Sequence, residues 1–241
     1  MKHLNAVIFG IAMVVSAYFL GNAYAERANP PQHISITGLG TENFSSDLIV
    51  WEGRFSTFNT NLKQAFEALK KDKELVKDYL TKKGIAEENI IFKAVQTIEQ
   101  RDNRYENGNF VGSDFRGYEL NQEVQIESAN VEKVESVSRE ITELLNQGVQ
   151  FNSSPPRYYY TKLADLKIKM ISKATEDARV RAENIAENSG SKLGDLISAK
   201  MGVFQITGQN SDEAYSWGGV YNTASKKKTA SITMRLEYKV N

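Results

Sequence analysis

Hydrophobic and polar residues alternate along several stretches of the chain, which is the pattern of β-strands with one buried face. The clearest alternation fills residues 230–240, where every second side chain is hydrophobic. A second alternation runs through residues 118–127 and opposes hydrophobic side chains to a row of acidic and amide side chains. Shorter strands are predicted at residues 34–41, 48–58, 90–98, 149–151 and 196–207. The polar row predicts a sheet face that is open to solvent or to a polar partner.

Three further segments repeat hydrophobic residues at helical spacing, at residues 60–84, 130–148 and 163–188. Each ends at or near a glycine, which is a common helix end. In the third segment, alanine recurs every four residues and forms what we call the alanine stripe. The alanine stripe consists of Ala174, Ala178, Ala182 and Ala186. Small side chains at this spacing let a helix approach its neighbour closely, so we expect a packing face rather than a cofactor site.

Together these elements predict an α+β fold, with three main helices packed on mixed or antiparallel sheets. We expect two small α+β lobes. The first lobe holds residues 33–112 and 225–241, and the second holds residues 113–210. Two polar segments stand apart from this scheme. One is an insertion-like loop at residues 101–116, which contains the hairpin-type turn signal Asn107-Gly108. The other is a segment rich in Gly, Ser and Asn at residues 208–225.

The N-terminus has the three parts of a secretory signal peptide. Lys2 supplies a positive charge, residues 4–20 form a largely hydrophobic run, and an Ala-x-Ala sequence ends at Ala25. We therefore expect residues 1–25 to be removed and a domain of residues 26–241 to be exported to the periplasm. The alternative is an uncleaved anchor at residues 4–20, which would then be the protein's contact with a membrane. Spanning a bilayer takes about 20 apolar residues.

Composition and charge remove several classes of function. The 241-residue chain has 30 basic and 30 acidic residues, so it lacks the basic footprint of a nucleic-acid-binding protein. It contains no cysteine, which excludes disulfides, thiolate nucleophiles and thiolate metal sites. His33 is the one histidine outside the predicted leader, so a histidine-based metal site lacks further ligands. We expect no metal, no cofactor and no catalytic residues; carboxylate chemistry is the enzymatic route that composition leaves open.

Three aromatic residues stand in the segment of residues 208–225, namely Tyr215, Trp217 and Tyr221. Aromatic side chains in such a polar segment are costly to expose unless they dock on something. They either fold back over the sheet and cap its core, or they contact a partner or a second copy of the chain. The sequence leaves both interpretations open. The lysines at residues 226–228 are interpreted as a solvated turn.

Several segments taken together resemble one family. Residues 34–40 (ISITGLG) are similar to the opening strand of SIMPL-domain proteins. The helix end at residues 84–85 (GI), followed by the strand at residues 90–97, is similar to a junction in that family. Residues 174–183 (ATEDARVRAE), with the exit GSKLG at residues 190–194, resemble its alanine-rich helix. These segments span nearly all of the chain that follows the predicted leader.

The resemblance implies an exported bacterial protein of two small α+β lobes with no established enzymatic activity. It also implies a loose association with envelope and oxidative-stress defence and, in some members, large homo-oligomers. The family has no agreed catalytic residues, so none is carried over to this chain.

Three classes of function follow from these observations. The class that we favour is a non-catalytic exported envelope protein that acts by self-assembly, as a homo-oligomer, or by binding an envelope protein partner. The second class is a ligand-binding module with a cleft between its lobes. The third is a hydrolase that uses carboxylates alone, which would need two acids within about 5–10 Å of each other.

Overall fold

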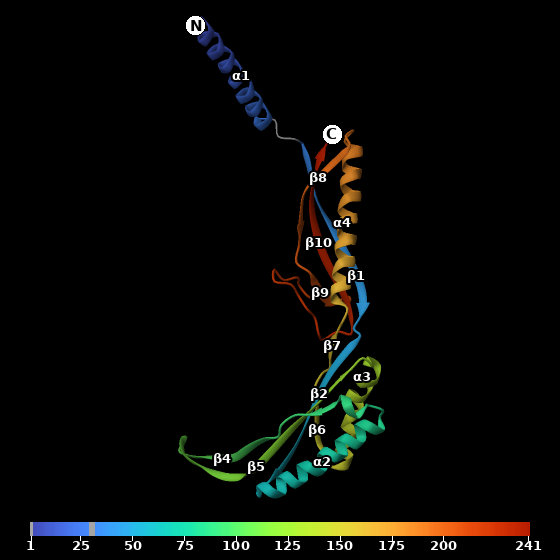
Figure 1. The fold of residues 1–241 in the computed structure, drawn as a ribbon. Helices are drawn as coiled ribbons and strands as arrows, with labels where there is room; N and C mark the ends of the chain where they lie inside the picture. Colours follow the sequence, from blue (N-terminus) through green and yellow to red (C-terminus); the bar gives the residue numbers. More distant parts are fainter. Residues whose placement is uncertain (1, 29–31) are drawn as a thin grey trace. The chain divides into compact units, whose positions relative to one another are not determined.

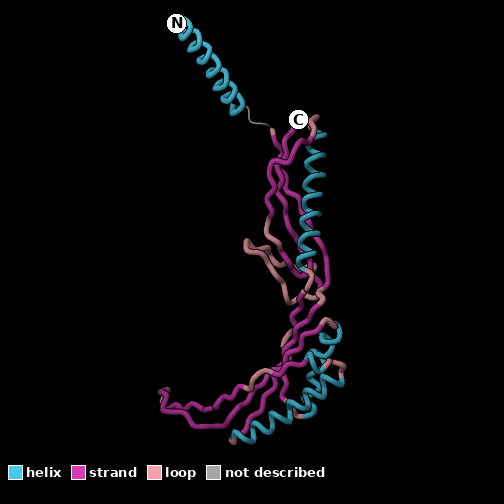
Figure 2. Tube along the Cα trace, in the orientation of Figure 1, coloured by secondary structure: helices cyan, strands magenta, loops and turns pink. Residues whose placement is uncertain are grey.

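The structure is a computed structural model that describes residues 2–28 and 32–241, with the side chains of residues 8–24 and 32–241. Its helices and strands are those of an α+β fold, as the sequence predicts (Figure 1, Figure 2). The chain forms two compact units. Unit 1 comprises residues 1–40, 170–202 and 232–241, and unit 2 comprises residues 41–169 and 203–231. Two strands and one helix contribute residues to both units.

Unit 1 is built on a sheet in which β10 (Lys227–Val240) lies between β1 (His33–Ser45) and β8 (Leu193–Met201). Strands β8 and β10 run antiparallel. In the C-terminal part of β10, buried and more exposed side chains alternate as the period of two predicts. Helix α4 (Leu163–Asn188) begins and ends where its helical spacing predicts. Strands β1 and β10 and helix α4 are the elements that continue into unit 2.

Helix α1 (Lys2–Ala28) contains most of the residues that are predicted to form the leader. Within the described residues, no helix combines the length and the apolar character that crossing a membrane requires. Removal of residues 1–25, and the alternative of an anchor at residues 4–20, stay predictions.

The alanine stripe of α4 is completely buried at all four positions, and β1 approaches it at Gly38 and Gly40. A Cβ atom on Gly38 would lie 2.2 Å from the carbonyl oxygen of Ala174. A Cβ atom on Gly40 would lie 2.5 Å from that of Met170. Because real Cβ atoms do not come so close to a carbonyl oxygen, both positions require glycine. Strand and helix therefore meet backbone to backbone.

Unit 2 contains a six-stranded sheet in the order β3-β5-β2-β6, with β4 added to β5 and β7 added to β2. All of these pairings are antiparallel. The strands are β2 (Leu48–Asn59), β3 (Ile90–Phe92), β4 (Gln96–Glu106), β5 (Asn109–Ser128), β6 (Gln150–Ser153) and β7 (Arg157–Tyr159). The helical elements are α2 (Leu62–Lys82), η1 (Glu87–Asn89), α3 (Val131–Glu140) and η2 (Ile141–Gln147). A further strand, β9 (Gln205–Gly208), pairs with the first residues of β10.

The helices of unit 2 cover one face of this sheet. Leu69 and Val76 of α2 and Val134 of α3 join Trp51 and Phe55 of β2 in one buried hydrophobic cluster. The acidic and amide row of β5 belongs to the opposite face, which no helix of the described chain covers. The alternation of residues 118–127 therefore predicted the two faces of β5, except that Asn121 of the polar row is buried.

Residues 101–116 are not the loop expected from the sequence. They form the distal parts of β4 and β5, which pair as far as Glu106↔Asn109. Asn107 and Gly108 make the turn with φ angles of +48° and +80°, the backbone that an Asn-Gly pair favours in two-residue hairpins. The turn signal Asn107-Gly108 is thereby confirmed. The strands themselves were not predicted, because neither of their faces is buried and no hydrophobic alternation marks them.

The two units also depart from the predicted lobes. That prediction separated residues 33–112 from residues 113–210, yet β2 and β5 pair from Asn59↔Tyr118 onward and lie in one sheet. Residues 225–241, assigned to a single lobe, are divided between both units. Long-range strand pairing decides the division, and the periodicity of a sequence does not show which strands pair.

Ala178→Leu is expected to lower the free energy of unfolding by about 1–3 kcal/mol through overpacking. A Cβ atom on Gly38 would already lie 2.7 Å from Ala178 Cβ, so the interface has no space for a leucine side chain. Val180→Leu, at a position of the same helix that is 42% exposed, is the matched control and should change stability by less than about 0.5 kcal/mol. Urea unfolding followed by circular dichroism measures both, and equal stabilities would contradict the packing.

Candidate functional site

The segment between β9 and β10 presents an aromatic side chain to solvent. Trp217 is 100% exposed and Tyr215 is 65% exposed. Tyr221 is 43% exposed, and the centroid of its ring lies 6.5 Å from that of Tyr159. The interpretation that these residues fold back and cap the core is therefore wrong for Trp217. The other interpretation, contact with a second molecule, stays a prediction.

The turn that carries Trp217 is held by Gln205, a buried amide at the start of β9. Its Oε1 accepts hydrogen bonds from the Val220 N–H at 2.8 Å and from the Ser216 N–H at 3.4 Å. Its Nε2 donates to the Ser216 carbonyl oxygen at 2.7 Å. The Gly219 N–H donates to the same oxygen at 3.1 Å and closes the turn. The backbone on both sides of Trp217 is thus fixed, although its side chain is fully exposed.

Two charged residues organise the rest of this segment. Glu213 accepts a hydrogen bond from the side-chain amide of Asn222 at 2.5 Å. Lys228 is 1% exposed, and its Nζ donates to the carbonyl oxygens of Asn222 at 2.6 Å and of Ser225 at 2.5 Å. The interpretation of this lysine as part of a solvated turn is wrong. Its ammonium group is instead buried and joins two carbonyl oxygens of the loop by hydrogen bonds.

The neighbouring lysines differ from one another in their surroundings. Burial lowers the pKa of Lys228 from its ordinary 10.5 to about 8, and Glu213 acts in the opposite direction. Lys226 forms ion pairs with Glu132 at 2.9 Å and with Glu135 at 3.1 Å, which raise the pKa of Lys226. Lys227 is exposed. Two of these three lysines therefore hold the loop in place.

A groove of about 340 Å³ lies beside the Trp217 turn, and we call it the Val203 groove. Its walls come from Leu163 and Lys167 of α4, from Val203 and Phe204, from Ile206, and from residues 218–221. The Lys167 ammonium lies 5.6 Å from the centroid of the Phe204 ring. The groove therefore combines apolar walls with a cation at an aromatic ring, immediately next to an exposed indole.

Strands β4 and β5 form a long hairpin (Figure 1), and its side chains make a second exposed apolar surface. Toward its turn, β5 pairs with β4 but with no other described strand, and an isolated two-stranded hairpin is marginally stable in water. Tyr105 is 62% exposed and Phe110 is 60% exposed, and their rings pack 5.9 Å apart. At the base of the hairpin, Leu62 and Phe66 of α2 border an apolar groove of about 560 Å³.

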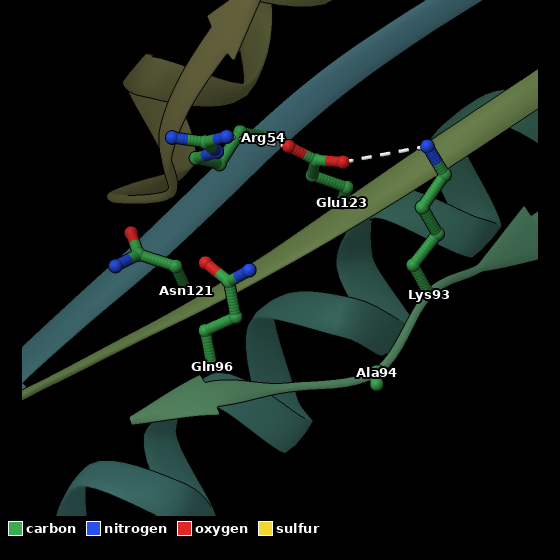
Figure 3. A pocket seen from close by; sticks show the side chains of 6 residues that line it. All are labelled: Arg54, Lys93, Ala94, Gln96, Asn121 and Glu123. Atoms are coloured by element: carbon green, nitrogen blue, oxygen red, sulfur yellow. Dashed lines mark hydrogen bonds and ion pairs between the residues drawn. The ribbon is translucent and has the colours of Figure 1, made fainter. Parts of the chain in front are cut away.

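The open face of the unit 2 sheet contains a polar hollow of about 170 Å³ (Figure 3). The carboxylate of Glu123, on β5, forms ion pairs with the Arg54 guanidinium at 2.5 Å and with the Lys93 ammonium at 3.4 Å. The amides of Gln96 and Asn121 line the same hollow. Arg54, together with Lys93, holds the pKa of Glu123 below its ordinary value.

This hollow does not have the arrangement that a carboxylate hydrolase requires, which includes one acid that stays protonated. Glu52 also pairs with Lys93, at 2.8 Å, and raises the pKa of that lysine. These ion pairs balance the charges around the hollow, and they favour the deprotonated form of Glu123. Among the described side chains, no group of three or more His, Cys, Asp or Glu residues is placed to hold a metal ion.

The residues singled out from the sequence do not form one cluster. Trp217 projects from its turn, whereas Tyr221 lines the Val203 groove. The alanine stripe belongs to unit 1 and the aromatic residues to unit 2. Sequence reasoning missed Gln205, Lys228 and Lys167. Gln205 and Lys228 matter because they are buried and bonded to the loop, and Lys167 matters because it lies beside Phe204. A single polar residue next to a hydrophobic strand does not show from the sequence whether it is buried or what lies beside it.

Lys228→Met is expected to loosen the loop between β9 and β10, because the carbonyl oxygens of Asn222 and Ser225 lose their donor. A buried polar group left unpaired costs about 1–3 kcal/mol, so the free energy of unfolding should fall by that amount. Limited proteolysis should also cut residues 209–226 faster. Lys227→Met, at the exposed neighbouring position, is the control and should change neither result. Equal effects of the two substitutions would contradict the assigned role.

The stability that Lys228 contributes should rise with pH between about 8 and 10.5. In this range the unfolded chain still binds a proton that the folded chain has released, so raising the pH favours the folded state. Subtracting the unfolding free energy of Lys228→Met from that of the wild type isolates this group. The difference should grow across the range, whereas a difference that shrinks would show that the folded-state pKa is not lowered.

A comparison with protein-family models matches residues 34–239 to the SIMPL model, which is described as a protein of unknown function (DUF541). No curated protein matches the chain. The matched range begins in β1, ends in β10 and includes residues of both units. It is well over half of the 241 residues, and it confirms the resemblance seen in the sequence motifs. The chain belongs to the SIMPL family.

Proposed function

We propose that this protein is a non-catalytic protein of the cell envelope that acts by self-assembly through the Trp217 turn. The observation that carries the proposal is a fully exposed tryptophan on a turn whose backbone Gln205 holds in place. Membership of a family of unknown function is compatible with such a role. The signal-peptide pattern of residues 1–25 supports export to the periplasm, and the family resemblance supports a link to envelope or oxidative stress.

The energetics of an exposed tryptophan favour association. Its side chain buries about 150–250 Å² when it docks, which at about 25 cal/mol per Å² corresponds to about 4–6 kcal/mol before the cost of association. Part of that cost is the ordering of flexible segments at an interface. The hydrogen bonds of Gln205 have already ordered this turn, so docking Trp217 loses little backbone entropy.

Binding of a different envelope protein is the other form of this proposal. The β4–β5 hairpin favours it, because Tyr105 and Phe110 form a second exposed aromatic surface. A ligand-binding module gains less support from the polar hollow of the sheet. That hollow measures about 170 Å³, below the roughly 300–1,000 Å³ that is usual for ligand pockets. The Val203 groove of about 340 Å³ and the apolar groove of about 560 Å³ beside α2 fall within that range and are the places where such a module would bind its ligand.

Trp217→Ala is expected to shift the association of the protein to higher concentration while leaving the free energy of unfolding within about 0.5 kcal/mol of the wild type. Size-exclusion chromatography with light scattering, run on the leaderless chain over a range of concentrations, measures the mass. The wild type should form a discrete multimer. Tyr105→Ala tests the hairpin in the same way, and a larger effect there would move the contact to the hairpin.

A wild-type protein that stays monomeric at every concentration would overturn self-assembly. Loss of folding stability in Trp217→Ala, with the mass unchanged, would also contradict the proposal, because it would give the side chain a role inside the chain.

A further inference from the structure

The Trp217 turn and the Val203 groove lie side by side on unit 2, one as a projecting side chain and the other as a depression. We propose that Trp217 of one copy inserts into the Val203 groove of a second copy, and that Trp217 of the second copy inserts into the Val203 groove of the first. This inference rests on the proposed self-assembly and identifies the surface that carries it. Such a reciprocal arrangement is that of a two-fold dimer, in which the same patch of both copies is used.

The chemistry of the groove suits an indole ring. Val203, Ile206 and Leu163 provide apolar walls, and the groove volume of about 340 Å³ falls within the range in which proteins enclose small ring systems. Lys167 lies 5.6 Å from the Phe204 ring, so the groove already places a cation at an aromatic face. Tryptophan is the aromatic side chain that cations attract most strongly.

The turn is not free to place Trp217 in the groove of its own chain. A Cβ atom on Gly219 would lie 3.0 Å from the Phe204 carbonyl oxygen and 3.2 Å from Val203 Cγ1, so the turn already packs on the groove wall. Gly219 also has φ +91°, and Ser216 is bound to Gln205 on the other side of Trp217. Seating the indole in its own groove by moving the turn would break these contacts. A second copy meets the exposed indole without disturbing them.

The charges around the two features are complementary. The segment that leads to Trp217 carries Asp212 and Glu213 and has no basic residue between residues 209 and 217. The groove is lined by one charged side chain, the exposed Lys167 of α4. When the indole of one copy enters the groove of the other, the acidic segment approaches this lysine. A second copy therefore supplies both the indole and the acidic residues that suit the groove.

The expected affinity follows from the area. Two indoles bury about 300–500 Å² of tryptophan surface in total, below the roughly 1,600 Å² of a standard stable interface. Val203 (47% exposed) and Tyr215 (65%) adjoin the contact and add apolar area. We therefore expect a dimer that dissociates at about micromolar concentration, so that dilution reaches the monomer.

The first experiment follows the fluorescence of Trp217 during dilution. The chain has two tryptophans, and Trp51 is completely buried with its Nε1 donating to Ser153 Oγ at 3.0 Å. Trp217→Phe leaves Trp51 as the single emitter, so subtraction gives the spectrum of Trp217. Its emission should shift to shorter wavelength as concentration rises, over the same range in which light scattering shows the mass to double.

The second experiment mixes two variants, each of which removes one half of the contact. Trp217→Ala keeps the groove and loses the indole, and Val203→Glu keeps the indole and places a carboxylate at the groove. Each variant alone should dissociate at a concentration at least about 30-fold higher than the wild type, as expected for a hot-spot residue. Their mixture should associate more tightly than either, because the heterodimer retains one complete contact. Circular dichroism and unfolding curves establish that both variants are folded.

The outcomes separate this inference from the proposed function. Failure of the mixture to recover association, or a multimer in which Trp217 emission stays that of an exposed indole, would overturn the inference and leave self-assembly standing. A monomer at all concentrations would overturn both. A short-wavelength Trp217 emission that does not depend on concentration would show insertion within one chain and would overturn the reciprocal contact.

Discussion

The antiparallel pairing of β2 with β5 is the interaction on which unit 2 depends. It runs from Ile49↔Ser128 to Asn59↔Tyr118, along almost all of β2. The strands added to this pair complete the sheet, and α2 and α3 bury its hydrophobic face. Because the helices lie on one face, no described helix covers the other face of this sheet. The distal hairpin and the loop before β10 also expose aromatic side chains. Those uncovered surfaces are where contacts with other molecules can form.

In the loop before β10, buried polar groups stabilise a backbone that carries an exposed aromatic side chain. Burying a charged lysine is unfavourable unless its donors are satisfied, and Lys228 satisfies them with backbone oxygens of the loop itself. Gln205 similarly uses its amide on both sides of the Trp217 turn. These bonds fix the backbone while the indole points away from the protein.

Much of the fold could be predicted from local pattern, because local pattern reports burial. Helix α4 and the alternation of β10 followed from periodicity, as did the alanine stripe. The strand that packs on that stripe could not be predicted, because Gly38 lies more than a hundred residues earlier in the chain and no local sequence pattern connects it to the helix. The turn of the distal hairpin was marked by Asn107-Gly108, but its two strands escaped prediction because both of their faces are exposed. Lys228 escaped because a lysine beside other lysines has the same local pattern whether it is solvated or buried.

The accessibility of Trp217 in the assembled protein tests the central claim most directly. Iodide quenching, with the Trp51 contribution removed by use of Trp217→Phe, measures that accessibility at concentrations where light scattering shows a multimer. Our account predicts that Trp217 is protected from iodide in the multimer and becomes fully accessible on dilution to the monomer. A multimer in which iodide quenches Trp217 as efficiently as in the monomer would contradict it.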